Sequence, residues 1–181
     1  MSDSSFYIFI DVESTGFCPM KNDVSSIGVI VADSNYREVG AFYTKVRPDI
    51  NNFISDKALE VSGFSRDQLS TFIPRRDAII KFMHFLKPYV EATPQTMVSH
   101  TVNNFDYRFV DWMFRKEDLH FSLYRIIHYE YQLSTIKMGR EAGHATNSLE
   151  EWASRLKLSF NHHNALDDAR MCYNIFKCLS Q

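Results

Sequence analysis

Three segments rich in β-branched and aromatic residues follow one another within the first 46 residues of the chain. They cover residues 6–12 (FYIFIDV), 24–32 and 38–46. Gly16 and Pro19 interrupt the chain after the first segment, and Asp33-Ser34-Asn35 predicts a turn after the second. Strands joined by such short links pair side by side in opposite directions. The N-terminal quarter of the chain therefore predicts an antiparallel meander.

The remainder of the chain alternates between helical and strand patterns. Residues 48–71 are polar, with short helical pieces, and short strands are expected at 96–99 and 128–133. Helices are expected at 74–91, 105–114, 134–141, 148–156 and 165–179. Three strands followed by alternating helices and strands favour an α/β fold with a mixed sheet flanked by helices. Since no repeat or linker interrupts the pattern, we expect one domain over residues 1–181.

Composition restricts the classes of protein to consider. Of the 181 residues, 45% are hydrophobic and 23% are charged, as in ordinary globular proteins. No apolar run approaches the ~20 residues that cross a bilayer, and the first residues lack a signal-peptide pattern. The three cysteines form no disulfide framework, which favours a cytoplasmic location. The net charge of -2 argues against a protein that coats duplex nucleic acid, so a nucleic-acid partner would be gripped over a short stretch.

Two acidic residues stand at the end of the first apolar segment. Asp11 and Glu13 are two positions apart, so on a strand both side chains point to the same face. Neighbouring carboxylates repel, and burial increases the cost of their charge. A cation between them removes both penalties, and carboxylate oxygens suit Mg²⁺ or Mn²⁺. The alternative is that both acids lie at a solvated strand end.

Further polar candidates lie at the starts of two expected helices. Asp106 falls in the first turn of one helix and Asp168 in the first turns of the last, where a carboxylate also stabilises the helix dipole. His163 lies on the loop before that last helix, and a histidine suits proton transfer near neutral pH. His162 and Asp167 are adjacent competitors, and spacing alone does not choose between the neighbours.

Taken together and in order, these motifs resemble the DEDDh family of 3′→5′ exonucleases, the group that includes the proofreading subunit of bacterial replicative DNA polymerase. The matching motifs are Asp11-Val12-Glu13-Ser14-Thr15-Gly16, then Asn104-Phe105-Asp106, then His163-x-Ala165-x-x-Asp168. The resemblance implies an RNase H-like fold, with a five-stranded mixed sheet whose first three strands are antiparallel. It also implies two Mg²⁺ or Mn²⁺ ions held by Asp11, Glu13, Asp106 and Asp168, with His163 as the general base.

The implied reaction is two-metal hydrolysis of phosphodiester bonds from the 3′ end of single-stranded DNA or RNA, releasing nucleoside 5′-monophosphates. The expected partner is the single-stranded 3′ end itself, and no membrane is expected. A DNA polymerase or repair complex as partner, and a homodimer, are left open. Candidate contacts to the nucleotides are Ser14, Thr15, Gly16, Phe17, Phe64, Asn104 and Phe105. For the three phenylalanines, stacking on bases competes with simple core packing.

Two alternatives stay open. One is an exoribonuclease that trims short RNA 3′ ends, and the other is a non-catalytic nucleic-acid-binding module. The chain departs from the family pattern at Ser62, where proofreading-type members often have histidine, so its contact with the 3′-terminal nucleotide is expected to differ.

Overall fold

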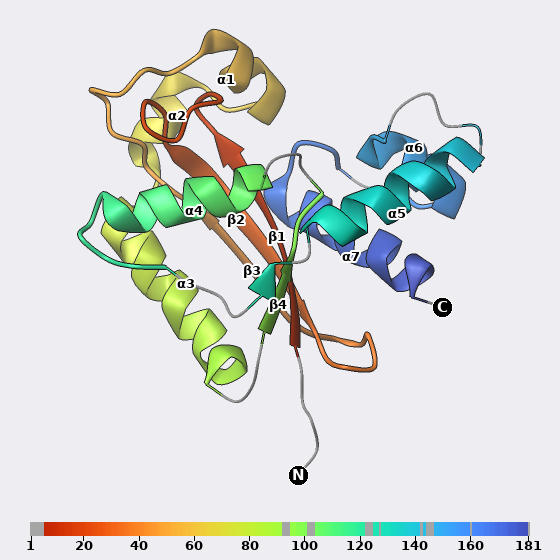
Figure 1. Cartoon of the computed structure of the whole chain (residues 1–181). Coiled ribbons are helices and arrows are strands. Elements are labelled where there is room, and N and C mark those ends of the chain that lie inside the picture. The colour runs from red at the N-terminus through yellow and green to blue at the C-terminus, as the bar shows by residue number, and fades with distance from the viewer. Residues whose placement is uncertain are drawn as a thin grey trace.

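A mixed β-sheet lies between two groups of helices in the computed structural model of the chain (Figure 1). The structure describes residues 6–91, 95–100, 104–121, 125–126, 128–141, 143, 147–159 and 161–180, with the backbone alone at 125–126 and 128–133. The strand order is β3-β2-β1-β4-β5, so the first strand of the chain is the central one. No helix in these ranges is both long and apolar enough to cross a membrane.

The first three strands form the predicted antiparallel meander. They are β1 (Phe6–Ser14), β2 (Val24–Ala32) and β3 (Glu38–Lys45), and β1 pairs with β2 while β2 pairs with β3. Asp11 lies opposite Gly28, which in turn lies opposite Tyr43. Every residue of β2 is buried, as expected for a strand that has a neighbour on each edge and helices across its face.

The second half of the sheet is parallel and short. β4 (Gln95–Val98) pairs parallel with β1, and β5 (Arg125–Ile126) pairs parallel with β4. The predicted five-stranded sheet is thus a mixed sheet of four full strands, with only a two-residue pairing in the fifth position. The strand predicted at 128–133 is wrong, because these residues begin helix α5 (His128–Glu141). Since neither glycine nor proline separates 128–133 from 134–137, the helix runs through the whole stretch.

The remaining helices lie within one or two residues of their predicted bounds where bounds were predicted. They are α1 (Asp56–Ser62), α2 (Arg66–Thr71), α3 (Arg75–Val90), α4 (Phe105–Arg115), α6 (Leu149–Leu156) and α7 (Ala165–Leu179). Side-chain caps begin several of them. Ser148 accepts a hydrogen bond from the Glu151 amide at the start of α6, and Asn164 accepts from the Leu166 and Asp167 amides at the start of α7.

Strand β1 contributes alternate side chains to two hydrophobic cores. Ile8, Ile10 and Val12 pack on the side of α3 and α4, whereas Phe9 packs on the side of α6 and α7. Burial of each such side chain contributes roughly 1.5–3 kcal/mol, which fixes the register of the strand. Asp11 and Glu13 continue the Phe9 side, so the two cores together determine where these carboxylates point.

Candidate active site

The end of β1 supplies two carboxylates to one face of the sheet. Glu13 is buried and Asp11 is partly exposed, and together with Asp168 they form a group whose ligand oxygens all lie within 4.8 Å of one another. The expectation that Asp11 and Glu13 share a face therefore agrees with the geometry. A strand held by two cores gives them a rigid support.

Asp106 approaches the same strand end from α4. Asn104 precedes this helix with a left-handed φ of 53°, and Asp106 in the first turn is fully buried. Its Oδ1 accepts a hydrogen bond of 3.1 Å from the amide of Val12, the residue between Asp11 and Glu13. Asp106 is thereby tied to the backbone that carries the other two acids.

Asp168 reaches the cluster because α7 packs directly on the sheet. A Cβ added to Gly28 would lie 2.1 Å from the Ala165 carbonyl carbon, so only glycine permits this approach. Gly28 is the β2 partner of Asp11, which places the first turns of α7 opposite the acidic strand end. The carboxylate of Asp168 is buried and accepts a 3.0 Å hydrogen bond from the His163 amide.

Crowding of these acids raises their pKa values. Burial raises the pKa of Glu13 to about 7, with added repulsion from Asp168 and Asp106. Burial and the charges of Asp106, Asp168 and Glu13 raise the pKa of Asp11 well above its usual range. Burial also raises the pKa of Asp168, although hydrogen bonding to His162 opposes the shift. A bound cation would relieve each of these penalties, so the donor set fits an oxygen-preferring divalent ion such as Mg²⁺ or Mn²⁺.

Two stacked histidines border the acidic cluster. The His162 and His163 rings lie 3.8 Å apart between centroids, and a ligand atom of each falls within 4.8 Å of Asp168. His163 is exposed and has a left-handed φ of 64°. Burial and the neighbouring His162 lower the pKa of His163, while Asp168 and Glu150 partly oppose this.

His162 makes contacts that spacing did not reveal. Its Nδ1 lies 3.0 Å from Asp168 Oδ1 and its Nε2 lies 2.7 Å from Glu150 Oε1, so it bridges α7 and α6. Glu150 was not predicted at the site, and neither was His100. The only signal for Glu150 was its place in the first turn of α6, where acidic residues are common for helix-dipole reasons alone.

A hollow of about 480 Å³ opens at the acidic cluster. Asp11, Glu13, Asp168, the two histidines and Glu150 are among the residues that line it. Phe17 and Phe105 form its apolar wall, and both also border an adjoining hollow of about 150 Å³ that includes Lys57. Phe17 is strongly exposed and lies 6.5 Å from Phe105 between ring centroids. The arrangement combines a carboxylate cluster, two histidines and aromatic rings at one opening.

The other predicted substrate contacts divide into two groups. Ser14 and Gly16 border the smaller hollow, whereas Thr15 is buried and its hydroxyl accepts a 2.9 Å hydrogen bond from the Asp23 amide. Asn104 immediately precedes α4, next to Phe105. Phe64 lies elsewhere: it packs 5.0 Å from Phe72, under the ammonium group of Lys45. The structure therefore brings Phe17 and Phe105 to the opening and leaves Phe64 in a packing position.

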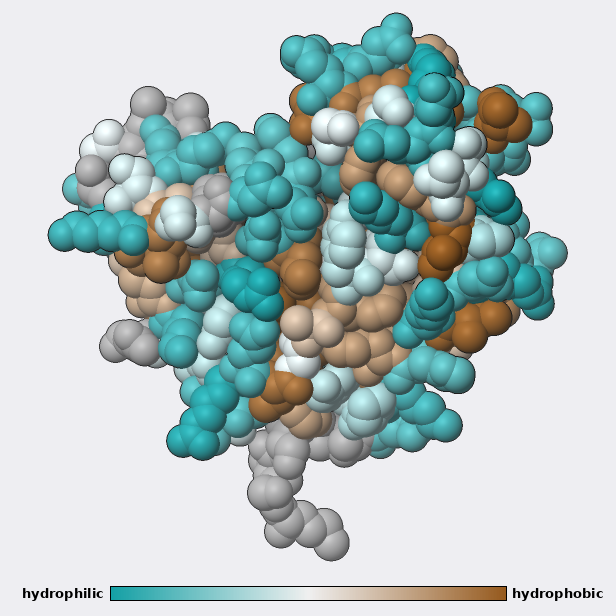
Figure 2. Space-filling model, turned by 180° about the vertical axis from the view of Figure 1, so that it is seen from behind, coloured by the Kyte–Doolittle hydropathy of each residue, from teal (hydrophilic) through white to brown (hydrophobic). Residues whose placement is uncertain are grey.

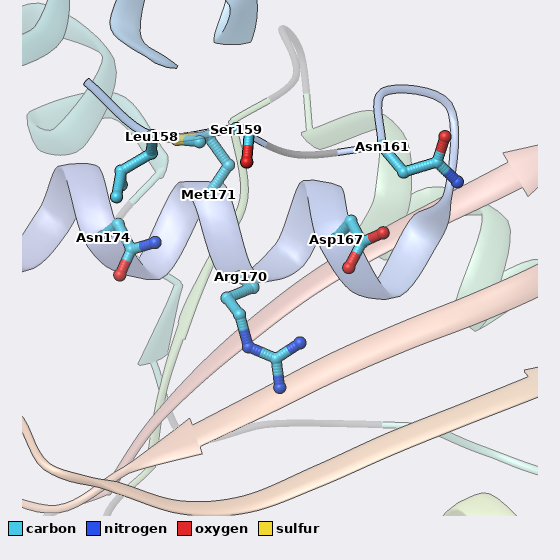
Figure 3. Close-up of a pocket in the computed structure, with 7 residues that line it drawn as sticks. All are labelled: Leu158, Ser159, Asn161, Asp167, Arg170, Met171 and Asn174. Carbon is cyan, nitrogen blue, oxygen red and sulfur yellow. The ribbon is translucent and has the colours of Figure 1, made fainter. Parts of the chain in front are cut away.

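A larger hollow, of about 630 Å³, lies on another side of α7 (Figure 3). Asp167 lines it together with Arg170 and Asn174, and Arg170 forms an ion pair of 2.9 Å with Glu38. Asp167 and Asp168 thus serve different surfaces, although they are adjacent in the chain. The hollow contains none of the clustered acids, so its size does not make it the better candidate.

Comparison with known proteins indicates the family of the chain. A model of the RNase_T exonuclease family matches residues 8–176. The chain is 28% identical to a PolC-type DNA polymerase III of Thermotoga petrophila over 96% of its length, but it spans only 12% of that relative. It is 23% identical to the 3′-5′ DNA exonuclease Cap18 of Escherichia coli, covering 99% of this chain and 94% of the relative.

Solved structures show the same fold. The nuclease domain of 3′hExo, a DEDDh family member bound to rAMP, superposes with a TM-score of 0.74 and 17% identity, covering 99% of this chain and 94% of that one. The predicted resemblance to the DEDDh exonucleases is confirmed by these matches together with the family model. The chain belongs to the RNase_T exonuclease family.

Proposed function

We propose that this protein is a metal-dependent exonuclease that shortens single-stranded DNA from its 3′ end and releases nucleoside 5′-monophosphates. The observation that carries the proposal is the group of Asp11, Glu13 and Asp168, whose ligand oxygens lie within 4.8 Å and whose pKa values are raised. Repulsion between buried carboxylates destabilises a fold, and a cation bound between them removes this cost. The relationship to a 3′-5′ DNA exonuclease supports DNA as the substrate.

Two Mg²⁺ or Mn²⁺ ions would be held by Asp11, Glu13, Asp106 and Asp168. When bound, they would supply positive charge at the scissile phosphate and lower the pKa of a water. The chain's own contribution is to hold the four acids on three rigid elements, β1, α4 and α7. Such preorganisation is what lets electrostatic stabilisation act without rearrangement.

His163 is proposed to accept the proton of the attacking water. Its exposed ring lies at the rim of the hollow, and its backbone amide is fixed by Asp168. Because its pKa is lowered, the ring is neutral near pH 7 and can take up a proton. His162 is held between Asp168 and Glu150, which suits it to orient the loop instead.

The terminal nucleotide is proposed to lie against Phe17 and Phe105, with Ser14 and Gly16 near its sugar. Aromatic faces accept any base, which fits an enzyme without sequence preference. Since the polymerase relative is far longer than this chain, we also propose delivery to the substrate within a polymerase or repair complex. A homodimer stays a prediction.

The test is digestion of a 5′-labelled single strand with Mn²⁺ or with EDTA. We expect a ladder of products shortened from the 3′ end, with mononucleotide release in Mn²⁺ only. Digestion of an RNA strand in parallel tests the exoribonuclease alternative. If RNA is cleaved faster than DNA, RNA and not DNA is the substrate.

Matched variants locate the chemistry. Asp11→Ala and Asp168→Ala should lose activity while keeping the fold. Asp167→Ala alters the adjacent acid on the other surface of α7 and should stay active. Wild-type cleavage by Asp11→Ala would refute the assignment of the metal site.

A further inference from the structure

Exposed hydrophobic side chains gather on two loops next to the candidate active site. The described part of the chain has ten exposed large hydrophobic residues, and the four most exposed of them fall in residues 15–23 and 46–55. The exposed fractions are 82% for Phe17, 68% for Met20, 85% for Ile50 and 67% for Phe53. Large apolar side chains gathered in this way commonly mark a binding surface.

The two loops are tied together by buried polar groups. The Nδ2 of Asn22 donates a 2.7 Å hydrogen bond to the Phe53 carbonyl, and the Ser55 amide donates one of 2.9 Å to the Thr15 carbonyl. Asp23 accepts from the Asp49 amide at 3.0 Å. Both Asn22 and Asp23 are buried. The exposed rings are therefore carried by a braced backbone, which reduces the entropy lost when a ligand binds.

This surface is continuous with the candidate active site at one end. Phe17 lines both the larger hollow beside the carboxylates and the smaller one with Lys57. In Figure 1 the loop after β1 lies at the same end of the sheet as α1 and α2. In the view from behind, hydrophobic surface shows among hydrophilic side chains on the lobe that contains these helices (Figure 2).

The other end of the surface offers positive charge. Arg47 and Arg66 line a hollow of about 390 Å³ together with Ile50. Arg66 pairs with Asp56, whereas Arg47 is exposed and pairs with no acidic residue among those described. Lys21, on the first loop, is exposed as well. Asp49 lines the same hollow, so Arg47 and Lys21 are the cations available to a ligand, and apolar side chains beside such cations match the bases and phosphates of a single strand.

We propose that Met20, Ile50 and Phe53, which follow on from Phe17 at the active site, form a platform for the nucleotides that precede the 3′ terminus. The inference rests on the proposed function, since the strand is assumed to end at the carboxylates. Bases stack on Phe53 and contact Ile50, and a phosphate reaches Arg47. The platform predicts that the enzyme binds strands of several nucleotides more tightly than dinucleotides.

The test measures affinity apart from cleavage. A fluorescently labelled 12-nucleotide single strand is titrated in EDTA, and binding is followed by anisotropy. We expect the double variant Ile50→Ala/Phe53→Ala to bind about 10-fold more weakly, the lower end of the loss for one base–aromatic stack. The control, Ile80→Ala/Met83→Ala, removes two comparably apolar exposed side chains from α3 and should bind like the wild type. Thermal unfolding checks that both variants fold.

The outcomes separate this proposal from the proposed function. Equal affinity of the two double variants, or no binding by the wild type, overturns the platform. Loss of affinity in the loop variant alone supports it, even if no strand is ever shortened in Mn²⁺. In that case the nuclease assignment fails while the binding surface stands. A ratio of kcat/KM for a 12-mer over a dinucleotide that falls about 10-fold in the loop variant supports both.

Discussion

Two regions with buried acids lie at the two ends of the loop after β1. They differ in whether cationic side chains surround the buried carboxylates. Asp23 and Glu13 are 4% and 8% exposed, so burial penalises the charge of both. Asp23 receives a 2.7 Å contact from the Lys116 ammonium group, and Arg75 lies 3.5 Å away. Neither Asp11 nor Glu13 forms an ion pair with a lysine or arginine in the described part of the chain.

The pKa values follow from this difference. Burial raises the pKa of Asp23, but hydrogen bonds from Lys116 and Asn52 and the charge of Arg75 outweigh it, and the net pKa is lowered. At Glu13 burial and neighbouring acids act together, and the pKa rises to about 7. Among the described residues, Lys116 and Arg75 pair with Asp23, whereas no lysine or arginine pairs with Asp11 or Glu13, which face the hollow. The comparison therefore supports the proposal that a cation from solution binds at Asp11 and Glu13 rather than at Asp23.

The largest expected effect tests whether the region around Asp11 and Glu13 carries out catalysis. His163→Ala should slow nucleotide release by ~10²–10⁴-fold, the usual contribution of a positioned acid or base. Because the ring is exposed, the variant should unfold at nearly the wild-type temperature. His162→Ala is the matched control, and we expect a smaller loss of rate. A larger loss in His162→Ala would exchange the roles of the two histidines.

The next effect tests whether Asp23 and its cationic partners stabilise the fold. Asp23→Ala leaves Lys116 and Arg75 without their partner and frees the Asp49 amide, so we expect a loss of about 4 kcal/mol in the free energy of unfolding. Urea denaturation measures it. Asp11→Ala should cost far less stability, since it relieves repulsion. If the two variants lost equal stability, the contrast between the regions would be wrong.

The fold that separates these two acidic regions could be predicted only in part from the sequence. Apolar periodicity placed β1 to β3 and most helices, because each of these elements buries one face over many residues. It failed at 128–133, where aromatic residues favoured a strand and an uninterrupted helix formed. The short β5 carries only two residues, too few for any periodic signal.

At the site, the family resemblance predicted Asp11, Glu13, Asp106 and Asp168 as one group. In the structure, Asp106 on α4 and Asp168 on α7 lie next to the end of β1 that carries Asp11 and Glu13. The counter-charges of Asp23 could not be foreseen, since Lys116, the residue after α4, lies 93 residues away in the chain. The contacts of His162 with Glu150 and Asp168 were missed because they depend on how the loop before α7 packs against α6. Pairings between distant elements depend on how α6, α7 and the sheet pack.

A third expected effect concerns pH. Folded Glu13 binds a proton more tightly than the unfolded chain, because its pKa rises from 4.5 to about 7. The free energy of unfolding should therefore fall as pH rises through this interval, by about 3 kcal/mol from Glu13. Denaturation in EDTA at pH 5 and pH 8 measures the fall, and Glu13→Gln should remove this share of it. An identical pH dependence in the variant would mean that Glu13 is not strained by its neighbours.

The smallest expected effect tests how much nearby positive charge the buried carboxylate of Asp23 needs. Arg75 lies farther from Asp23 than Lys116 does and is shared with Glu117 at 3.6 Å. Arg75→Met keeps the packing of the aliphatic stem and removes the charge. Because Lys116 stays in hydrogen-bond contact with Asp23, we expect a loss of only about 1 kcal/mol in urea denaturation. A loss as large as that of Asp23→Ala would mean that one cation does not suffice to offset the buried charge of Asp23.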